Sequence, residues 1–497
     1  MTTLARLLLD RAAQRPDLRL GVAGDLVRLD EAVAIARSGA ELLAGSGLGP
    51  GSRLAITAGT STDQLVFWMA CQLAGVEVAM VNPSYPDDLL GEMFAQLQPQ
   101  AVAAAGAADL GDSSRGQRTV WAYDGLREGR LIRDGEVLAL GPATGSRPPG
   151  LDVEPLSIAG YQHTSGTTGL PKFCAQSHTY FAALGRFVAD SLCIGPDDRV
   201  YAPLPSFHIN PFGYGFLGGL TAAADVVMAT RFSASEFWST VRDERITVMF
   251  LHAPPVEILK KRTSPDDARG HTVRAMFFTD TDFLDRYDIG VGLSGYGSTE
   301  AAGLCHTWTW RRGEQPDVPE GASRVGGMVR HDVEARVDEA GQIFVRGRVP
   351  GILFSGYRGA AGLVPATDEQ GWFATGDLGR IDAQGRLVFL ERMAESIRVK
   401  GEFVPIGHVE QVHARLHDLQ DLAIWKRAGP LGGDEVVLYA VCDAVPADAV
   451  RSIAAELPPF MRPTAVARVA QLPRDAAAGK VQRRRLTDVP VLEWVEL

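Results

Sequence analysis

Residues 161–172 carry the clearest chemistry in this sequence, reading Tyr-Gln-His-Thr-Ser-Gly-Thr-Thr-Gly-Leu-Pro-Lys. Two glycines, four hydroxyl side chains and one lysine fall within the last nine of these residues. Glycine lets backbone N–H groups approach an anion closely, and hydroxyl and ammonium groups donate further hydrogen bonds to the same oxygens. We therefore expect a loop that grips a polyphosphate. The candidate ligands are Thr164, Ser165, Gly166, Thr167, Thr168, Gly169 and Lys172.

This loop does not follow the Walker A pattern, in which a lysine comes directly after the last glycine and a hydroxyl residue follows the lysine. Here Lys172 lies three residues beyond Gly169, and Phe173 follows it. Because Ser, Thr and Gly are also ordinary residues of exposed loops, a loop without a ligand stays open as the simpler interpretation.

Four later stretches also place side chains with useful chemistry at expected turns. The first joins an aromatic ring, two hydroxyls and a carboxylate, and the second sets Asp377 in an expected tight turn. The third is basic and contains Gly401, and the fourth contains Lys480. Each also has a structural interpretation, such as a turn aspartate, a helix N-terminal acid or a solvated lysine, so only their joint order carries weight. The stretches are residues 295–300, 372–382, 392–410 and 473–486.

The composition is that of a globular protein with more than one domain. A chain of 497 residues exceeds what a single core accommodates, and 46% hydrophobic with 22% charged residues is typical of a soluble fold. A net charge of −11 argues against a nucleic-acid binder. The N-terminus meets charged residues too early for a signal peptide, and no apolar run reaches the roughly 18 residues of a membrane span. Five scattered cysteines without metal-ligand spacing indicate a reduced, cytoplasmic setting.

The elements that must position these residues alternate between strands and helices through residues 4–286. Such alternation predicts an α/β fold with parallel strands and ligands at their carboxyl ends. The region 106–156 is rich in Gly, Arg, Asp and Pro, and we expect one strand at 137–140 and an exposed connector at 141–155. The expected strands are 54–58, 76–81, 199–202, 226–229, 248–251 and 273–278, and the expected helices are 30–44, 63–73, 83–96, 177–192, 211–223, 234–242 and 256–261.

The pattern changes after Gly327. Short strands with tight turns predict a small β-rich subdomain, and the last ~100 residues have the pattern and size of a separate small α+β unit. The expected elements are strands 333–337, 342–346 and 371–375, then helix 404–416, strands 423–426 and 436–442, and helix 447–457.

Taken in order, these stretches resemble the adenylate-forming superfamily of acyl-CoA synthetases, luciferases and non-ribosomal adenylation domains. The resemblance covers nearly the whole chain, and the loop 164–172 together with the turn 296–300 is highly specific. It implies a large N-terminal domain, residues 1–391, with two βαβ-type sheets and a small β-rich subdomain. It also implies a small mobile α+β C-terminal domain, residues 392–497, and the use of ATP (released as AMP), Mg²⁺ and coenzyme A.

The resemblance further implies roles for matched residues of the first domain. Residues 164–172 would clamp the β- and γ-phosphates of ATP, and Tyr296, between Gly295 and Gly297, would stack on adenine. Thr299 would hydrogen-bond the α-phosphate. Glu300 would hold Mg²⁺, a hard cation that prefers carboxylate and phosphate oxygens.

Residues of the second domain and of the acyl pocket are matched in the same way. Asp377 would bind the ribose hydroxyls with Arg392 close to the same sugar, and Lys480 would bridge the substrate carboxylate and the α-phosphate. Gly401 would let pantetheine pass the backbone, and His208 would line the acyl pocket. The expected pocket is mostly apolar and compatible with aromatic, fatty or terpenoid acids; its residues are Phe207, His208, Gly213, Phe216 and Leu293.

Three departures from the family pattern concern adenylation and the hinge. A glycine-rich turn normally follows the strand at 273–278, whereas this chain continues into Thr279-Asp280-Thr281-Asp282, and two aspartates near a nucleotide would repel phosphate unless they point away or bind a metal. The hinge position is Ala394, with Ile406 and His408 replacing the usual Pro and Glu. The segment 473–479 is one residue longer than usual, which could displace Lys480 by ~3.5 Å.

The sequence thus predicts a cytoplasmic, Mg-ATP-dependent acid–CoA ligase that binds a small carboxylic acid, with neither nucleic acid nor a membrane span involved. Three alternatives stay open. Adenylation is weakened or lost and the enzyme converts a preformed acyl-adenylate; the acyl group passes to a carrier protein; or the protein binds nucleotide and acyl group without turnover.

Overall fold

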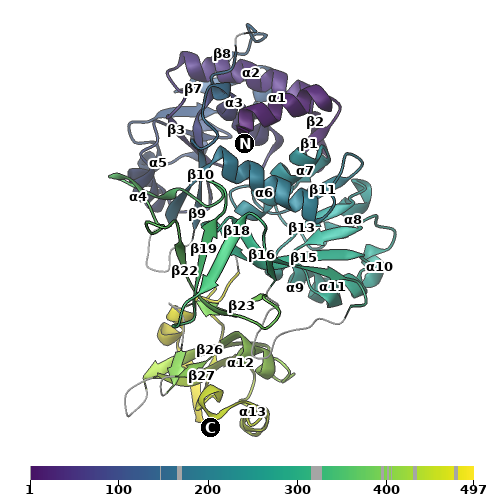
Figure 1. Ribbon diagram of the computed structural model, residues 1–497, viewed down its shortest axis with the longest axis vertical. Coiled ribbons are helices and arrows are strands. Elements are labelled where there is room, and N and C mark those ends of the chain that lie inside the picture. The colour runs from purple at the N-terminus through teal and green to yellow at the C-terminus, as the bar shows by residue number, and fades with distance from the viewer. Residues whose placement is uncertain are drawn as a thin grey trace. The chain divides into compact units, whose positions relative to one another are not determined.

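The computed structural model describes residues 2–145, 147–164, 171–314, 327–392, 397–399, 402–404, 406–428, 434–474 and 479–497. The chain divides into two compact units (Figure 1). The first contains residues 1–315, 330–334 and 345–373, and the second contains residues 316–329, 335–344 and 374–497. The predicted boundary between residues 391 and 392 falls inside the second unit, and it stays a prediction.

One large sheet of the first unit carries the strand that leads into the expected phosphate loop. Strands β3, β4, β5, β6 and β9 pair in parallel, and β10 returns antiparallel to β9. The strand order is β21 (Gly362–Val364), β20 (Gly356–Gly359), β10 (Lys172–Ser177), β9 (Ile158–Thr164), β4 (Glu77–Val81), β3 (Arg53–Thr57), β5 (Ala101–Ala104), β6 (Thr119–Ala122), β7 (Arg130–Arg133) and β8 (Glu136–Ala139).

A second large sheet carries the turn that contains Glu300. Its parallel strands follow the predicted βαβ pattern, and an antiparallel pair, β15 and β16, extends it. The strand order is β16 (Gly303–Arg311), β15 (Val291–Ser298), β14 (Ala275–Phe277), β13 (Val248–Phe250), β11 (Arg199–Ala202), β12 (Asp225–Met228), β1 (Arg19–Val22) and β2 (Asp25–Arg28).

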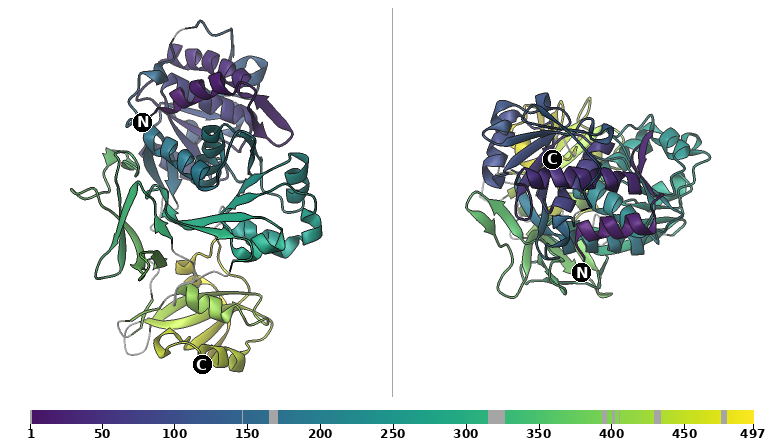
Figure 2. Two further views of the ribbon diagram at one scale, coloured as in Figure 1. Left: turned by 45° about the vertical axis from the view of Figure 1, so that its right-hand side comes forward. Right: turned by 90° about the horizontal axis from the view of Figure 1, so that it is seen from above.

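Both large sheets contribute to one apolar core. Helix α3 (Thr62–Ala74) is buried on nearly every side, as expected of a helix that is apolar all round. The Ser61 hydroxyl accepts the Gln64 N–H at its start, and Gly75 ends it at φ +80°. Helix α2 (Leu29–Gly45) lies beside it (Figures 1 and 2).

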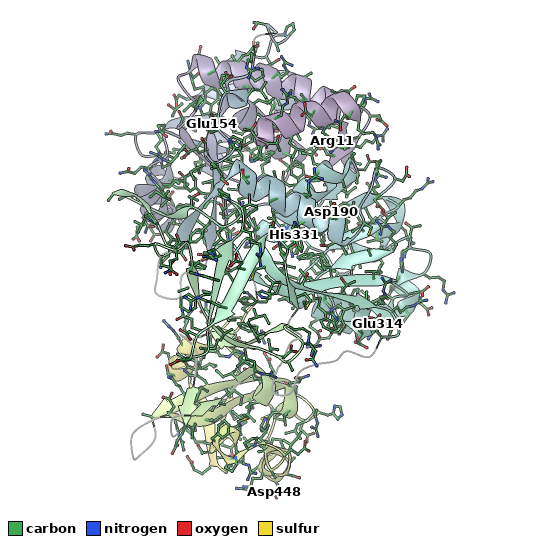
Figure 3. The ribbon with its side chains drawn as sticks, viewed as in Figure 1. Arg11, Glu154, Asp190, Glu314, His331 and Asp448 are labelled. Atoms are coloured by element: carbon green, nitrogen blue, oxygen red, sulfur yellow. The ribbon has the colours of Figure 1, made fainter. Side chains whose placement is uncertain are left out.

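Of the remaining helices of the first unit, α1, α6 and α7 contribute to the same core, whereas α4 packs in a second apolar cluster. Arg11 of α1, labelled in Figure 3, donates from Nε to the Leu220 carbonyl of α7 at 2.8 Å. These helices are α1 (Leu4–Gln14), α4 (Asp87–Leu97), α5 (Asp112–Arg115), α6 (His178–Ser191), α7 (Leu217–Ala222), α8 (Phe237–Asp243), α9 (Ala253–Arg262), α10 (Pro265–Ala268) and α11 (Thr281–Arg286). Among the described residues, none of the helices is both long and apolar enough to cross a membrane.

The second unit ends in a small α+β body with its own core, as predicted. Its strands pair in the order β26 (Asp421–Ala428), β27 (Asp434–Val441), β28 (Ala465–Val469) and β29 (Val491–Glu496). The elements that precede or accompany them are β24 (Ile397–Val399), β25 (Glu402–Val404), α12 (Ile406–His413) and α13 (Ala447–Ala454).

The predicted β-rich segment forms a four-stranded sheet. Its strands are β18 (Val333–Val337), β19 (Gln342–Gly347), β22 (Phe373–Ile381) and β23 (Leu387–Arg392), and the division between the two units crosses them. Asp377 lies within β22 rather than in a tight turn, because β22 continues to Ile381 and pairs Asp377 with Arg392 of β23. That part of the prediction was wrong.

The predicted α/β class is confirmed, with two local errors. The sequence does not predict β6 and β7, which extend the first sheet together with β8, the strand expected at 137–140. The single helix predicted at 211–223 is instead a π-helical segment at Asn210–Phe216 followed by α7. Glycines at 213 and 215 permit this tight packing, since a Cβ at Gly215 would lie 2.5 Å from that of Ala202.

Candidate active site

The β9–β10 hairpin presents the two described ends of the predicted phosphate loop. Thr164 ends β9, Lys172 begins β10, and the two residues are direct partners across the hairpin. Because β9 also pairs in parallel with β4, the loop leaves the sheet at the carboxyl end of a parallel strand, where α/β sheets bind ligands. The predicted ligands Ser165, Gly166, Thr167, Thr168 and Gly169 lie outside the described residues.

The turn from β15 to β16 carries Tyr296, Thr299 and Glu300. Two glycines are required there because the antiparallel strands approach closely: a Cβ at Gly295 would lie 2.0 Å from the His306 carbonyl oxygen, and one at Gly297 would lie 1.7 Å from that of Gly303. The predicted turn glycines therefore have a structural reason to be there. The Tyr296 side chain is mostly buried, with its ring centroid 6.2 Å from that of His306.

A buried tyrosine of α6 donates a hydrogen bond to the backbone of this turn. The Tyr180 hydroxyl donates to the Thr299 carbonyl oxygen at 2.9 Å, and Tyr180 is 1% exposed. Burial raises the pKa of Tyr180 well above its ordinary value, so the phenol stays protonated and remains a donor. The backbone between Thr299 and Glu300 is thus anchored directly to the helix that follows the phosphate hairpin.

The Glu300 carboxylate is held by neutral donors from the first sheet. The Tyr357 hydroxyl of β20 donates to Glu300 Oε1 at 3.1 Å. The Cys174 thiol of β10 lies within hydrogen-bonding reach of both Glu300 and Thr164, and burial followed by the Glu300 charge raises its pKa. Lys172 Nζ lies 5.0 Å from the centroid of the Tyr357 ring. These contacts bring three predicted site residues, Thr164, Lys172 and Glu300, into one cluster.

The donor set suits a magnesium ion that is shared with a nucleotide. Mg²⁺ is commonly bound through one or two carboxylates plus substrate phosphates, not by an all-protein cage. Glu300 is a half-buried carboxylate beside the phosphate hairpin, and no group of three or more His, Cys, Asp or Glu in metal-binding arrangement occurs among the described residues. The residues present therefore fit Mg²⁺ together with ATP.

The two aspartates that depart from the family pattern are paired with a lysine. Lys260 Nζ lies 2.8 Å from Asp280 Oδ2 and 3.0 Å from Asp282 Oδ2. Asp280 also begins α11, accepting the Phe283 N–H at 2.9 Å. The hydrogen bonds and charges of its acidic neighbours outweigh burial and raise the pKa of Lys260, so the lysine stays charged and offsets the repulsion expected from the aspartates.

The strand end before these aspartates is strained. Phe278 has φ +64°, a left-handed conformation that costs a non-glycine residue about 1–2 kcal/mol. Its N–H donates to the Leu293 carbonyl oxygen at 2.6 Å, so pairing with β15 holds it there. A glycine, as the family pattern has at this point, would adopt the same conformation without strain.

Of the predicted acyl-pocket residues, Phe207 and His208 share a ring cluster that the sequence did not single out. The Phe207 and His208 centroids are 4.7 Å apart, and His163 lies 6.2 Å from Phe207, 6.3 Å from His208 and 5.5 Å from Tyr85. Burial, with the nearby His208, lowers the pKa of His163 to about 3, so its ring is neutral at pH 7.

The other three predicted pocket residues lie in the apolar core. Phe216 stacks on Phe212 with centroids 5.5 Å apart, and Leu293 is 1% exposed. A Cβ at Gly213 would lie 2.5 Å from a Leu184 methyl carbon. Contact of these three with a substrate stays a prediction.

Lys480 of the second unit stands at the base of a closed loop. An isolated β-bridge joins Arg474 to Val481, and the Gln482 N–H donates to the Pro473 carbonyl oxygen at 2.8 Å. The displacement of Lys480 by the extra residue stays a prediction. Gly401 and Ala394 lie outside the described residues, and Ile406 and His408 are in α12.

A two-sheet α/β body with a hydroxyl-rich hairpin beside a glutamate turn defines an adenylate-forming enzyme. The family model described as AMP-binding enzyme matches residues 30–362, so the chain belongs to this family. It is 30% identical to the sulfoacetate–CoA ligase of Cupriavidus necator over 97% of both chains. It is 27% identical to the steroid-22-oyl-CoA synthetase of Rhodococcus jostii over 88% of this chain and 83% of that enzyme.

A solved structure has the same fold at lower identity. The o-succinylbenzoate CoA synthetase of Bacillus subtilis, in complex with its acyl-adenylate intermediate, superposes with a TM-score of 0.81 and 20% identity, covering 99% of this chain and 100% of its own. Family and relatives together confirm the predicted class, an acyl-CoA synthetase of the adenylate-forming superfamily.

Proposed function

We propose that this protein is an acid–CoA ligase that works through an acyl-adenylate. An oxygen of the substrate carboxylate attacks the α-phosphorus of ATP, and pyrophosphate leaves with the electron pair of the broken P–O bond. The CoA thiol then loses its proton, attacks the acyl carbon and forms the thioester as AMP departs. The observation that carries the proposal is the cluster of Thr164, Lys172 and Glu300 around Tyr357.

In the first half-reaction the hairpin donors hold the β- and γ-phosphates, and Thr299 donates to the α-phosphate. Bound at Glu300, Mg²⁺ would supply charge compensation to the phosphate oxygens. Tyr296 supports the adenine ring. These roles, including those of Ser165, Gly166, Thr167, Thr168 and Gly169, follow from the residue types and from the resemblance to the family, and substitution of each residue tests them.

The second unit supplies the other proposed contacts. Asp377 accepts hydrogen bonds from the ribose hydroxyls, Arg392 approaches the same sugar and Lys480 stabilises charge between the two reacting groups. Gly401 leaves room for pantetheine in the second half-reaction. The relatives named above are CoA ligases, which favours CoA over a carrier protein as acceptor.

For the acid, the ring cluster supports Phe207 and His208 as contact residues and adds His163 and Tyr85 as candidates. The names of the relatives include a small sulfonated acid and a steroid acid, so the test panel spans both classes. A cytoplasmic location stays a prediction, supported by five free cysteines.

The alternative in which adenylation is weakened is favoured by one observation, the strained Phe278 at the expected adenine slot. Two assays separate it from full ligation. The protein is incubated with ATP, Mg²⁺ and each acid of the panel, and separately with synthetic acyl-adenylates and CoA. Pyrophosphate release in the first assay supports the proposal. Thioester formation in the second assay alone supports the alternative.

Lys480→Ala tests whether Lys480 acts in the first half-reaction and not in the second. We expect it to abolish pyrophosphate release while thioester formation from the preformed acyl-adenylate continues. Loss of neither step would contradict the role proposed for Lys480.

A further inference from the structure

We infer that Tyr357 is a positioning residue for the adenylation half-reaction, giving Glu300 and Lys172 separate neutral partners so that each charge stays available to the magnesium–nucleotide complex. The inference rests on the proposed role of Glu300 at Mg²⁺. Tyr357 belongs to none of the motifs from which the site was predicted, and it lies 57 residues from Glu300 in sequence.

Tyr357 is well placed to fix both ends of Glu300. Its hydroxyl donates to the carboxylate at 3.1 Å, and three residues earlier the Phe354 N–H donates to the Glu300 carbonyl oxygen at 3.3 Å. A single segment thus holds the backbone and the side chain of the same residue. A carboxylate fixed in this way needs little further ordering when a cation binds.

The segment that carries Tyr357 is itself rigidly held. Strand β20 pairs with β10 so that Tyr357 lies opposite Cys174, and the Ser355 N–H donates to the Ala175 carbonyl oxygen at 2.8 Å. The Tyr357 ring packs edge-on against Phe354, with centroids 5.0 Å apart. The tyrosine is therefore part of the same sheet as the phosphate hairpin.

The chemistry of the contacts explains why a tyrosine serves here. A phenol donates a hydrogen bond without carrying charge, so Glu300 keeps its full negative charge for a metal. The face of the same ring attracts the Lys172 ammonium, whose Nζ lies 5.0 Å from its centroid. Among the described residues, Lys172 lies over the Tyr357 ring and Glu300 accepts from its hydroxyl, in place of an ion pair with each other. Such a pair would occupy both groups needed by ATP and Mg²⁺.

Two substitutions separate the two contacts. Tyr357→Phe removes the hydroxyl and keeps the ring, whereas Tyr357→Leu removes both. We expect Tyr357→Phe to weaken Mg²⁺ binding about 10-fold, the loss typical of a hydrogen bond to a charged group, with a smaller change in KM for ATP. Tyr357→Leu should in addition raise KM for ATP, because Lys172 loses its ring contact.

The primary measurement is calorimetric titration of Mg²⁺ into the full-length protein with a non-hydrolysable ATP analogue. The Mg²⁺ dependence of pyrophosphate release is the second, and thioester formation from a synthetic acyl-adenylate and CoA is the third. The inference requires the first two to shift and the third to stay within about twofold of the unsubstituted enzyme.

Tyr161→Phe provides a matched control. The Tyr161 hydroxyl donates to Glu77 Oε2 at 2.6 Å, a second Tyr–Glu hydrogen bond in the same sheet. It is expected to lower stability in a comparable way and to leave Mg²⁺ binding unchanged. Thermal unfolding of each variant accounts for any loss of folded protein.

Unchanged Mg²⁺ binding in Tyr357→Phe, or an equal shift in Tyr161→Phe, overturns the inference. Failure of the proposed function gives a different result, since the unsubstituted protein would then release no pyrophosphate. The calorimetric comparison of Tyr357→Phe with Tyr161→Phe still decides the role of Tyr357 in that case.

Discussion

Two lysine–carboxylate regions of the first unit use the same residue types in opposite ways. At the phosphate hairpin, Lys172 lies over the ring of Tyr357 and Glu300 accepts from its hydroxyl. At the start of α11, Lys260 binds Asp280 and Asp282 directly, at 2.8 and 3.0 Å. Charges that are paired with each other stabilise a local turn, whereas charges held by neutral groups remain free to bind a ligand.

This contrast also explains why two extra aspartates are tolerated near the expected adenine slot. Lys260 is only 15% exposed, and it faces the two aspartates and Glu257, whose Oε1 lies 3.4 Å away. A half-buried cation among carboxylates keeps its proton and reduces their field at the nucleotide. The positive charge of Lys260 thus compensates for the two aspartates that depart from the family pattern. Loss of adenylation does not follow from their presence.

The largest effect should come from removing the negative charge of Glu300. Glu300→Gln keeps the shape and the contact with Tyr357 but leaves nothing to attract Mg²⁺. We expect pyrophosphate release to fall by about 100-fold or more, the usual scale for a lost electrostatic contact at a reacting phosphate. Pyrophosphate is measured across a range of Mg²⁺ concentrations, with thioester formation from synthetic acyl-adenylate as the second assay.

Glu77→Gln is the control for Glu300→Gln, since Glu77 of β4 is a carboxylate that also accepts a hydrogen bond from a tyrosine. An equal loss of rate in both half-reactions of Glu300→Gln would indicate general damage to the protein. It would contradict the proposed contrast between free and paired charges.

The side chain of His163, in strand β9 of the hairpin, is neutral at pH 7. Its titration should make the free energy of unfolding depend on pH. Its folded pKa is about 3 and its ordinary pKa is 6.5, so below pH 6.5 the unfolded state binds a proton that the folded state does not. The free energy of unfolding therefore falls as pH drops from 6.5 towards 3, by about 2 kcal/mol at about pH 5 from this group alone.

Urea unfolding of the unsubstituted protein and of His163→Gln, at about pH 7.5 and about pH 5, isolates this contribution. His178 and His306, whose pKa values burial lowers to about 4, contribute equally in both proteins. The difference in free energy of unfolding between the two pH values should be smaller for His163→Gln. Equal differences would show that His163 is protonated in the folded state.

A smaller effect is expected at the paired charges. Lys260→Met leaves three carboxylates without their cation, but at least two of them are about half exposed or more, so solvent screens the loss. We expect the free energy of unfolding to fall by about 1 kcal/mol, measured by urea unfolding, and KM for ATP to rise most at low salt. Lys261→Met, at the exposed neighbouring position, should change neither.

The sequence predicted the large sheets well because their strands are short apolar runs between helices. The run at 76–81 appears as β4, and that at 199–202 as β11. The sequence did not indicate β7, because this four-residue strand pairs antiparallel with both of its neighbours near the sheet edge. Such strands exist through pairing with neighbours, and their own residues lack a distinctive period.

The site was predicted to the extent that its residues fall in contiguous motifs. Thr164, Lys172 and Glu300 do so, whereas Tyr180 and Tyr357 reach the site from α6 and β20. Contacts across 57 or 119 residues depend on the folded sheet, and one sequence holds no signal for them. His163 had a local signal, since it directly precedes Thr164 in the stretch 161–172.

The smallest effect should distinguish the two tasks of Asp280, which caps α11 and pairs with Lys260. Asp280→Asn keeps a side-chain oxygen for the Phe283 N–H, and asparagine is as good a cap as aspartate. Only one of the partners of Lys260 is lost, so we expect urea unfolding to show a change of about 0.5 kcal/mol or less. Asp280→Ala loses the cap as well and should cost about 1 kcal/mol more. If both variants were equally destabilised, the charge pair and not the cap would hold this turn, and the α11 cluster would then be a stronger counterpart to the hairpin than its exposed carboxylates indicate.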